Sequence, residues 1–208
     1  MAITSLSKIT VPLASDQSAT AQGLLMPKLQ YRFRVLLQGF GISTPSTELT
    51  KQVVDVTRPN VSFEPITLDV YNSRSYLAGK HTWEPISLTL REDVNNEVQK
   101  RVGEQLQKQF DFLEQASAAS GGDYKFVTKI EILDGGNGDG DTAANVLDTF
   151  ELYGCFVESA NYNTLAYATN DPVTVSLSIR YDNAIQTDDA GGIGNAVGRA
   201  FGSVLATD

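Results

Sequence analysis

Alternation of apolar and polar residues, the pattern of a β-strand with one buried face, recurs along the chain. The predicted strands are residues 28–40, 52–59, 65–71, 82–92, 124–133, 149–163 and 171–182. The inward positions of the third and fourth are Ile66, Leu68 and Val70, and Ile86, Leu88 and Leu90. The last strand is the most regular, with Val173, Val175, Leu177, Ile179 and Tyr181 on one face. The chain is therefore predicted to be mostly β.

Residues 93–116 change to the period of an amphipathic helix. Asp93 is a suitable N-cap residue at its start. Apolar residues then recur every three or four positions at Val94, Val98, Val102, Leu106, Phe110 and Leu113. We interpret this segment as one helix that covers an open face of a sheet.

The order of elements, strands followed by one helix and more strands, favours an antiparallel β-sandwich or partial barrel with the helix against it. Residues 1–27 are rich in Ser, Thr and Ala and are predicted to be a flexible arm. Residues 28–186 form the predicted β domain. Residues 187–208 form a Gly-rich tail, whose small residues at helical spacing leave docking on a neighbour as an alternative to a flexible end.

The charge balance argues against a protein whose main task is to hold phosphates. The chain has 25 acidic and 16 basic residues, a net charge of -9, and its basic residues are scattered. The single cysteine, Cys155, excludes an intramolecular disulfide and fits a reducing compartment. No stretch is apolar for long enough to span a bilayer, so no membrane span is expected.

Catalytic and cofactor motifs are lacking, and we predict no enzyme, no metal and no cofactor. The only histidine is His81, and a pair with Cys155 is much less expected than a buried cysteine. The Gly-rich run at 191–202 resembles a dinucleotide loop but follows no predicted strand.

One loop leaves calcium binding open as an alternative function, that of a calcium-dependent β-sandwich binding module. Residues 134–148 are rich in Asp and Gly, and Asp148 stands where a twelfth-position ligand would be. Thr142 occupies the position that needs glycine. The alternating oxygen ligands would be Asn137, Asp139 and Asp141.

The segment between the third and fourth strands, residues 71–83, is longer than the two to five residues of a usual hairpin tip. It is predicted to be a long cationic tip that also carries apolar side chains. These residues are Arg74, Lys80 and His81, together with Tyr76, Leu77 and Trp83.

Residues 54–97 resemble the tail tube proteins of contractile-tailed bacteriophages, which are related to the Hcp ring protein of type VI secretion. The resemblance lies in a strand, a hairpin tip, a returning strand and a capped helix, and in the final strand at residues 173–186. Its positions are Pro65, Asn72, Arg74, Ala78, Gly79, Trp83, Asp93 and Asn96.

This resemblance implies a structural virion protein whose hexameric rings stack into the conduit for DNA ejection. One sheet of each subunit would join a barrel that runs through the ring, and the hairpin would contact the next ring. A baseplate-proximal initiator ring is an alternative position. The residues implied in the contact are Tyr71, Asn72, Ser73, Arg74, Ser75, Tyr76, Leu77, Ala78, Gly79 and Lys80.

The resemblance also implies partners: tail sheath, baseplate and tail terminator proteins, in a virion assembled in the bacterial cytoplasm. Phage DNA would pass without specific binding, since each phosphate contact adds affinity. The polar faces of the candidate barrel strands would line the lumen, or their arginines would pair with acidic residues between subunits. These residues are Arg32, Arg34, Thr174, Ser176, Ser178 and Arg180.

Overall fold

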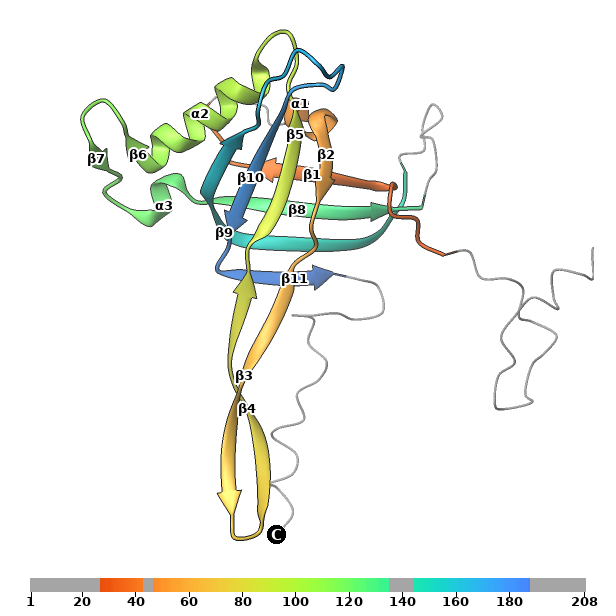
Figure 1. Cartoon of the computed structure of the whole chain (residues 1–208), viewed down its shortest axis with the longest axis vertical. Helices are drawn as coiled ribbons and strands as arrows, with labels where there is room; N and C mark the ends of the chain where they lie inside the picture. Colours follow the sequence, from red (N-terminus) through yellow and green to blue (C-terminus); the bar gives the residue numbers. More distant parts are fainter. Residues whose placement is uncertain (1–26, 43–46, 135–143, 188–208) are drawn as a thin grey trace, which may run out of the picture. The chain divides into compact units, whose positions relative to one another are not determined.

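The computed structural model of the chain describes residues 27–42, 47–134 and 144–187 (Figure 1). The chain divides into two units, residues 1–32 and 33–208. In the first, the backbone N–H of Arg32 donates to the carbonyl of Leu29 at 3.2 Å and closes a turn. Apart from Pro27 and Thr187, the predicted arm and the predicted tail lie outside the described residues.

Seven strands form one sheet in the order β1-β8-β9-β10-β5-β2, with β11 also paired to β9. All of these pairings are antiparallel, as predicted. The strands are β1 (Phe33–Gln38), β2 (Val53–Val56), β5 (Ile86–Arg91), β8 (Phe126–Leu133), β9 (Val146–Tyr162), β10 (Thr174–Arg180) and β11 (Asn183–Thr187).

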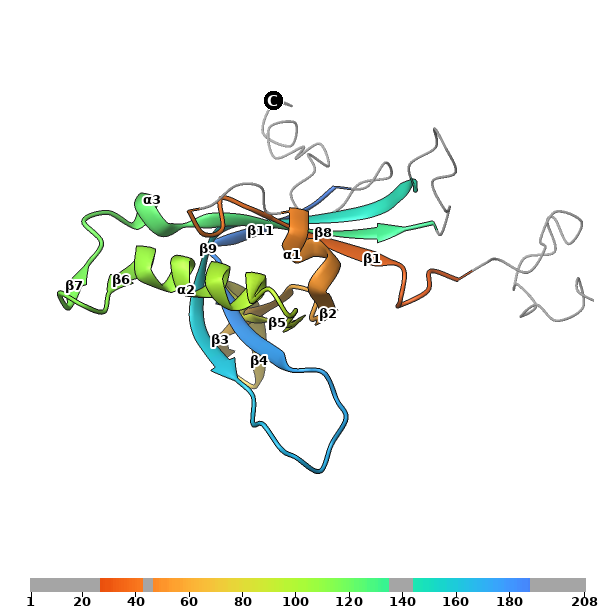
Figure 2. The same cartoon turned by 90° about the horizontal axis from the view of Figure 1, so that it is seen from above.

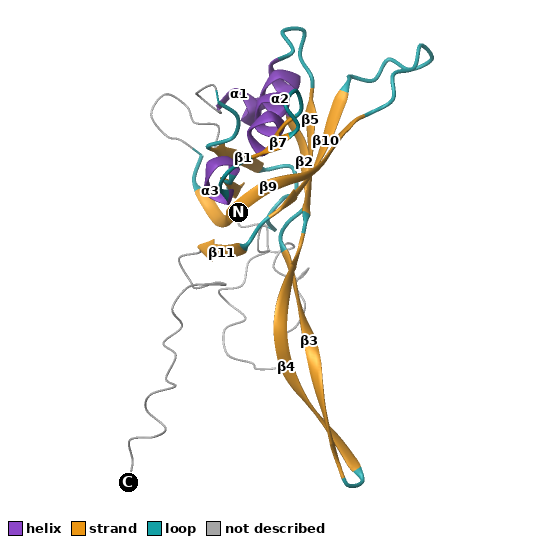
Figure 3. Cartoon of the chain, turned by 90° about the vertical axis from the view of Figure 1, so that its left-hand side faces the viewer, coloured by secondary structure: helices purple, strands orange, loops and turns teal. Residues whose placement is uncertain are grey.

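The long strand β9 joins two halves of this sheet. Its first part pairs with β8 and β11, which together with β1 we call the β8 half. Its last part pairs with β10, which together with β5 and β2 we call the β10 half. The strands of the two halves run across each other (Figures 1 and 3), so the chain forms a partly open sandwich without a closed barrel among its described residues.

The change of direction in β9 requires glycine. Gly154 has a φ of +68°, where an L side chain is strained, and a Cβ there would collide with the carboxylate of Asp182. Asp182 itself is held by Lys125, whose Nζ lies 2.5 Å from its Oδ2. A bulge then follows, since Ser178 pairs with Ser159 but Ile179 pairs with Val157.

Both halves bury one face in a single core, which confirms the predicted alternation from Val175 to Tyr181. Val173, predicted on the same face, precedes β10 and is 48% exposed. The side chains of Val175, Leu177 and Ile179 are at most 2% exposed. The rest of this core comes from both halves and includes Val35, Leu37, Ile86, Leu88, Leu90, Ile130 and Leu152. Since the two halves face the same core, their outer faces point away from each other.

Strand β1 is shorter than its sequence pattern predicts. It begins at Phe33, which pairs with Ile132, and its partner β8 ends one residue later at Leu133. The apolar–polar alternation continues N-terminal to β1, but among the described residues no strand pairs with that segment, and Tyr31 is 72% exposed.

Two further pairs of strands stand apart from this sheet. Strands β3 (Asn60–Val70) and β4 (Ser73–Glu84) form a ribbon that projects from the β10 half (Figure 1). Its tip is only Tyr71–Asn72, so the predicted long tip is in fact a long paired ribbon with a two-residue turn. Strands β6 (Phe110–Asp111) and β7 (Ala116–Ser117) form a small second hairpin.

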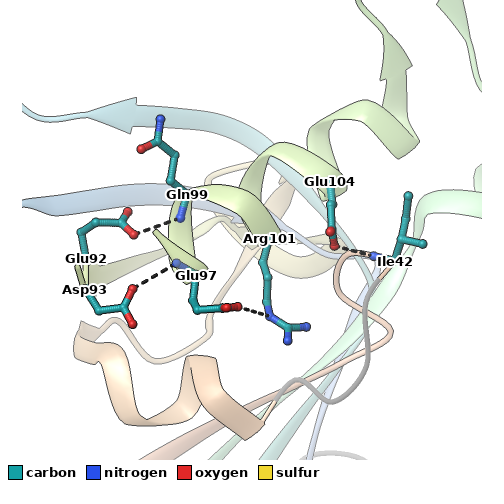
Figure 4. A network of polar contacts seen from close by, with 7 residues as sticks. All are labelled: Ile42, Glu92, Asp93, Glu97, Gln99, Arg101 and Glu104. Atoms are coloured by element: carbon teal, nitrogen blue, oxygen red, sulfur yellow. Dashed lines mark hydrogen bonds and ion pairs between the residues drawn. The ribbon is translucent and has the colours of Figure 1, made fainter. Parts of the chain in front are cut away.

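Helix α2 (Glu97–Gln109) is the predicted helix, shortened at both ends, and lies beside the sheet (Figure 2). Asn96 is the N-cap, but Asp93 satisfies the backbone N–H of Glu97 through its carboxylate at 3.0 Å (Figure 4). Val94, predicted on the buried face, precedes the helix and is 99% exposed.

A local side-chain bond ends α2 before its predicted terminus. The Asp111 carboxylate accepts hydrogen bonds from the backbone N–H groups of Leu113 and Glu114. These bonds offer the backbone a turn in place of a further helical turn, and they lower the pKa of Asp111. Phe110 therefore takes an extended conformation, and Leu113 is 91% exposed.

The sequence pattern did not predict α1 (Thr47–Gln52) or α3 (Gly121–Tyr124). Leu49 of α1 enters the core. Gln105, buried on α2, bonds to two other segments of the chain. Its Oε1 accepts from the backbone N–H of Gly41, after β1, at 3.0 Å, and its Nε2 donates to the carbonyl of Tyr124, in α3, at 2.7 Å. Helix α2 is therefore held both by the apolar contacts of its two buried valines, Val98 and Val102, and by these polar contacts.

Two valines of the predicted helix allow a matched test of this packing. Val102→Ala is expected to reduce the free energy of unfolding by about 2 kcal/mol, because it removes two buried methyl groups and leaves a cavity. Val94→Ala is expected to change it by less than about 0.5 kcal/mol, because Val94 is exposed. Urea unfolding of both variants measures the difference, and equal effects would contradict the observed start of α2.

Candidate assembly interface

The β3–β4 ribbon exposes apolar side chains along one of its two faces. Residues directly opposite each other in the pairing share a face, and Ile66 is opposite Leu77. Leu68 and Val70 follow on the same face of β3 because side chains alternate along a strand. We call Ile66, Leu68, Val70 and Leu77 the aliphatic face; their exposed fractions lie between 44% and 58%.

The opposite face of the ribbon is more polar. Tyr76 pairs with Thr67, so Tyr76 and Leu77, both predicted contact residues, point to different sides. Arg74 forms an ion pair with Asp69 across the ribbon, with 2.7 Å between Nε and Oδ1. The cation that was predicted to reach a neighbouring ring is therefore already paired within its own hairpin.

A bulge in the ribbon explains Gly79. Phe63 pairs with His81 and Pro65 pairs with Ala78, so two residues of β4 stand opposite one residue of β3. A Cβ on Gly79 would lie 2.5 Å from the carbonyl oxygen of Glu64, closer than atoms can approach. Glycine is required here for space.

Aromatic side chains attach the base of the ribbon to the core. The centroid of the Trp83 ring lies 6.1 Å from that of His81 and 5.7 Å from that of Tyr181. Tyr181 is the buried residue that follows β10. Burial raises the pKa of Tyr181 to about 12. The ribbon is thus anchored at its base and exposed along its length.

The structure brings together the predicted polar residues of β10. Asn163 donates to the hydroxyl of Thr174 at 2.7 Å, and Glu158 accepts from Arg180, with 2.9 Å between Oε1 and Nη2. Pairing with β5 adds Ser87 and Thr89 to the same outer face. We call Ser87, Thr89, Thr174, Ser176 and Ser178 the hydroxyl face.

Arg34 lies on the other side of the core, on the outer face of the β8 half. It pairs with Glu131 on the neighbouring strand. Arg32 precedes β1 and is not part of a strand. The structure therefore does not place Arg34 with the residues of β10, and both Arg34 and Arg180 pair with glutamates of their own subunit.

A second ion pair stands beside Arg34 and Glu131. Lys129 Nζ lies 2.5 Å from Glu151 Oε1, and the hydroxyl of Tyr153 donates to the same carboxylate. The hydrogen bond from Lys129, followed by that from Tyr153, lowers the pKa of Glu151, and the bond to Glu151 raises that of Lys129. The outer face of the β8 half is therefore charged but internally paired.

Both ends of the β10 half have unpaired strand edges within the described residues. One edge of β9 pairs with β8 only as far as Cys155, and the other edge pairs with β10. Beyond Cys155, as far as Tyr162, no described strand pairs with the edge that faces away from β10. At the other end, β2 pairs only with β5, and its Val54 is 49% exposed. Unpaired edges invite a further strand.

Of the residues considered for other chemistry, the structure describes His81, Asp148 and Cys155. Asp148 lies in β9, where both carboxylate oxygens accept from Gln186, whereas Asn137, Asp139, Asp141 and Thr142 lie outside the described residues. In the described parts of the chain, no three potential ligands gather for a metal and no helix could span a membrane. Cys155 is buried, which raises its pKa.

Solved structures share this fold. The tube-terminating cap of the anti-feeding prophage matches with a TM-score of 0.60 and 13% identity, over 84% of this chain and 99% of that one. The sheath/tube terminator of the extracellular contractile injection system PVC matches with a TM-score of 0.56 and 16% identity, over 79% and 99%. The SPP1 tail tube matches with a TM-score of 0.51 and 12% identity, over 78% and 80%.

No protein-family model and no curated protein sequence matches the chain. At these identities the likeness concerns the fold. It confirms the predicted resemblance to tail tube proteins at that level, and it covers nearly the whole of the matched chains in the two terminator structures.

The paired charges of the β8 half predict a dependence of stability on pH. Because the folded-state pKa of Glu151 is lowered, its contribution is complete above the ordinary value of 4.5 and is lost as pH falls through the folded-state pKa. The contribution of Lys129 is lost as pH rises through its raised pKa, above 10.5. Glu151→Gln should lower the free energy of unfolding by about 1 kcal/mol at pH 7. It should also make the melting temperature fall less steeply as the pH is lowered.

Melting temperatures between pH 3 and 8 measure this effect. The exposed Glu114→Gln is the control, because it removes a carboxylate outside the network. If the melting temperatures of the wild type and of Glu151→Gln fell equally steeply at acid pH, the pair would contribute nothing to the dependence of stability on pH.

Proposed function

We propose that the chain is a structural subunit of the tube of a contractile-tailed phage or a related injection machine. Six copies close into a ring, and rings stack into a hollow conduit through which DNA is ejected. The protein acts without catalysis. It is assembled in the bacterial cytoplasm, resides in the virion tail, and meets the sheath, the baseplate and the tail terminator.

The observation that carries this proposal is the exposed aliphatic face of the ribbon. Two-stranded ribbons are marginally stable in water on their own, and a row of four exposed aliphatic side chains marks an interaction site. In a fold shared with tube and terminator subunits, a neighbouring ring of the same protein is the partner that would cover it.

The free edges of the β10 half support closure into a ring. This half has four strands in antiparallel order, β9, β10, β5 and β2. Because four is even, the β2 of one copy would meet the β9 of the next in the antiparallel sense, and head-to-tail repetition of one contact closes a ring. Closure removes both free edges.

The direction of the strands supports the hydroxyl face as the lumen wall. Strand β4 leads into β5, so the ribbon continues the direction of the β10 half (Figure 1). If the ribbon reaches the next ring along the axis, these strands run along the pore. The β8 half and the helices would then occupy the wider outside. The hydroxyls would face the DNA together with Arg91, which pairs with Thr174 in the sheet, and with the Arg180–Glu158 ion pair. A wall made mostly of neutral hydroxyls would hold few phosphates.

Negative-stain electron microscopy of the purified protein tests the proposal directly. Rings or tubes are expected at high concentration or on an initiating complex. A species that stays monomeric at high concentration and never enters virions would refute the proposed function.

The two faces of the ribbon allow a sharper test. Ile66→Ser with Leu77→Ser places hydroxyls on one cross-strand pair of the aliphatic face and should shorten tubes strongly. Even about 1 kcal/mol lost per subunit is multiplied around each ring. The melting temperature of the subunit should change little, because both side chains are exposed.

Thr67→Ser with Tyr76→Ser is the matched control on the opposite face, where these two residues also form a cross-strand pair. It is expected to leave tube length closer to that of the wild type. A reversed order of the two effects would show that the other face of the ribbon makes the contact.

A further inference from the structure

We propose that Gln109 is a positioning residue that sets where the strand of a neighbouring copy begins to pair with β9. The inference rests on the proposed function, because it concerns the edge at which the ring would close. It adds a device that fixes the register of that junction.

The side-chain amide of Gln109 takes the place of a strand at one position of β9. Its Nε2 donates to the carbonyl of Val157 at 2.9 Å, and its Oε1 accepts from the N–H of the same residue, also at 2.9 Å. A residue in an adjacent antiparallel strand exchanges the same two bonds. The amide therefore satisfies the edge of β9 two residues beyond Cys155, which pairs with Phe126, the first residue of β8.

Gln109 is well held for this role. It is the last residue of α2, and the next residue closes the helix through a bond from Phe110 N to Leu106 O. Its own carbonyl accepts from Ala118 N at 3.4 Å. A groove of about 420 Å³ lies beside it, lined among others by Phe110, Tyr124 and Phe156.

Beyond Val157 no strand of the described part of the chain pairs with this edge of β9 as far as Tyr162. Ser159, Asn161 and Tyr162 are exposed there. An arriving strand can pair with this segment but cannot advance toward β8 without displacing both bonds of Gln109. The amide thus blocks sliding in one direction.

Register matters at this junction because side chains alternate along a strand. A slip of one residue would turn the side chains of the arriving strand to the opposite face. A ring repeats the same junction, so one fixed stop in each copy gives every junction the same offset. Because the stop belongs to the fold of the subunit, it is in place before two copies meet.

Cysteine cross-linking in assembled protein measures this register. Ser159→Cys on β9 is combined, one at a time, with Val53→Cys, Val54→Cys, Asp55→Cys or Val56→Cys on β2. The natural Cys155 is 0% exposed and will not compete. With Gln109 present, one of the four pairs is expected to dominate the disulfide products.

Gln109→Met keeps the length of the side chain but makes neither bond. It is expected to raise the product of a second pair relative to the dominant one by about tenfold, the ratio that corresponds to about 1.4 kcal/mol. Gln107→Met is the matched control on the same helix, because Gln107 bonds to Asp111 rather than to β9. It is expected to leave the pattern unchanged.

The outcomes separate three proposals: the role of Gln109, ring closure through β9, and the tube function. An unchanged single product in Gln109→Met, with the fold intact by circular dichroism, would overturn the role of Gln109 and leave ring closure through β9 supported. Tubes that form without any cross-link between β9 and β2 would overturn the role of Gln109 and the closure through β9 while leaving the tube function standing. Absence of any assembly would overturn all three.

Discussion

The bend of β9 is the constraint on which the rest of the structure depends. One strand pairs with β8 and β11 in its first part and with β10 in its last, so the two halves are fixed to each other through a continuous backbone. The bend is possible because Gly154 adopts a left-handed φ beside the carboxylate of Asp182. It gives the halves one common core, and it leaves the end of β9 without β8 beside it.

Much of the fold could be predicted from the period of the apolar residues, because that period reports which positions are amphipathic. It located β5, β8 and β10 and the central turns of α2. It could not report what covers an apolar face. Ile66, Leu68 and Val70 alternate as Ile86, Leu88 and Leu90 do, yet the first three are exposed and the last three are buried.

The other differences between prediction and structure come from contacts that the apolar period does not report: local side-chain bonds that replace helical ones, and contacts between residues far apart in the sequence. The end of α2 depends on a local turn at Asp111, which an apolar repeat through Phe110 and Leu113 does not reveal. The stop at Val157 joins two residues 48 positions apart, and a glutamine at a helix end gives no signal of it. The unpaired edges of β9 and β2 likewise follow from strand order, which the sequence pattern leaves open.

The attachment of the ribbon has a mechanical consequence. A two-stranded ribbon clamped at one end is a cantilever, so a load at its tip acts on the clamp as a torque that grows with the length of the arm. Here the clamp is the contact of Trp83 with Tyr181, and Tyr181 belongs to the core. Bending of the ribbon therefore changes the surroundings of Trp83, the only tryptophan of the chain, so its fluorescence would report a mechanical load on the ribbon.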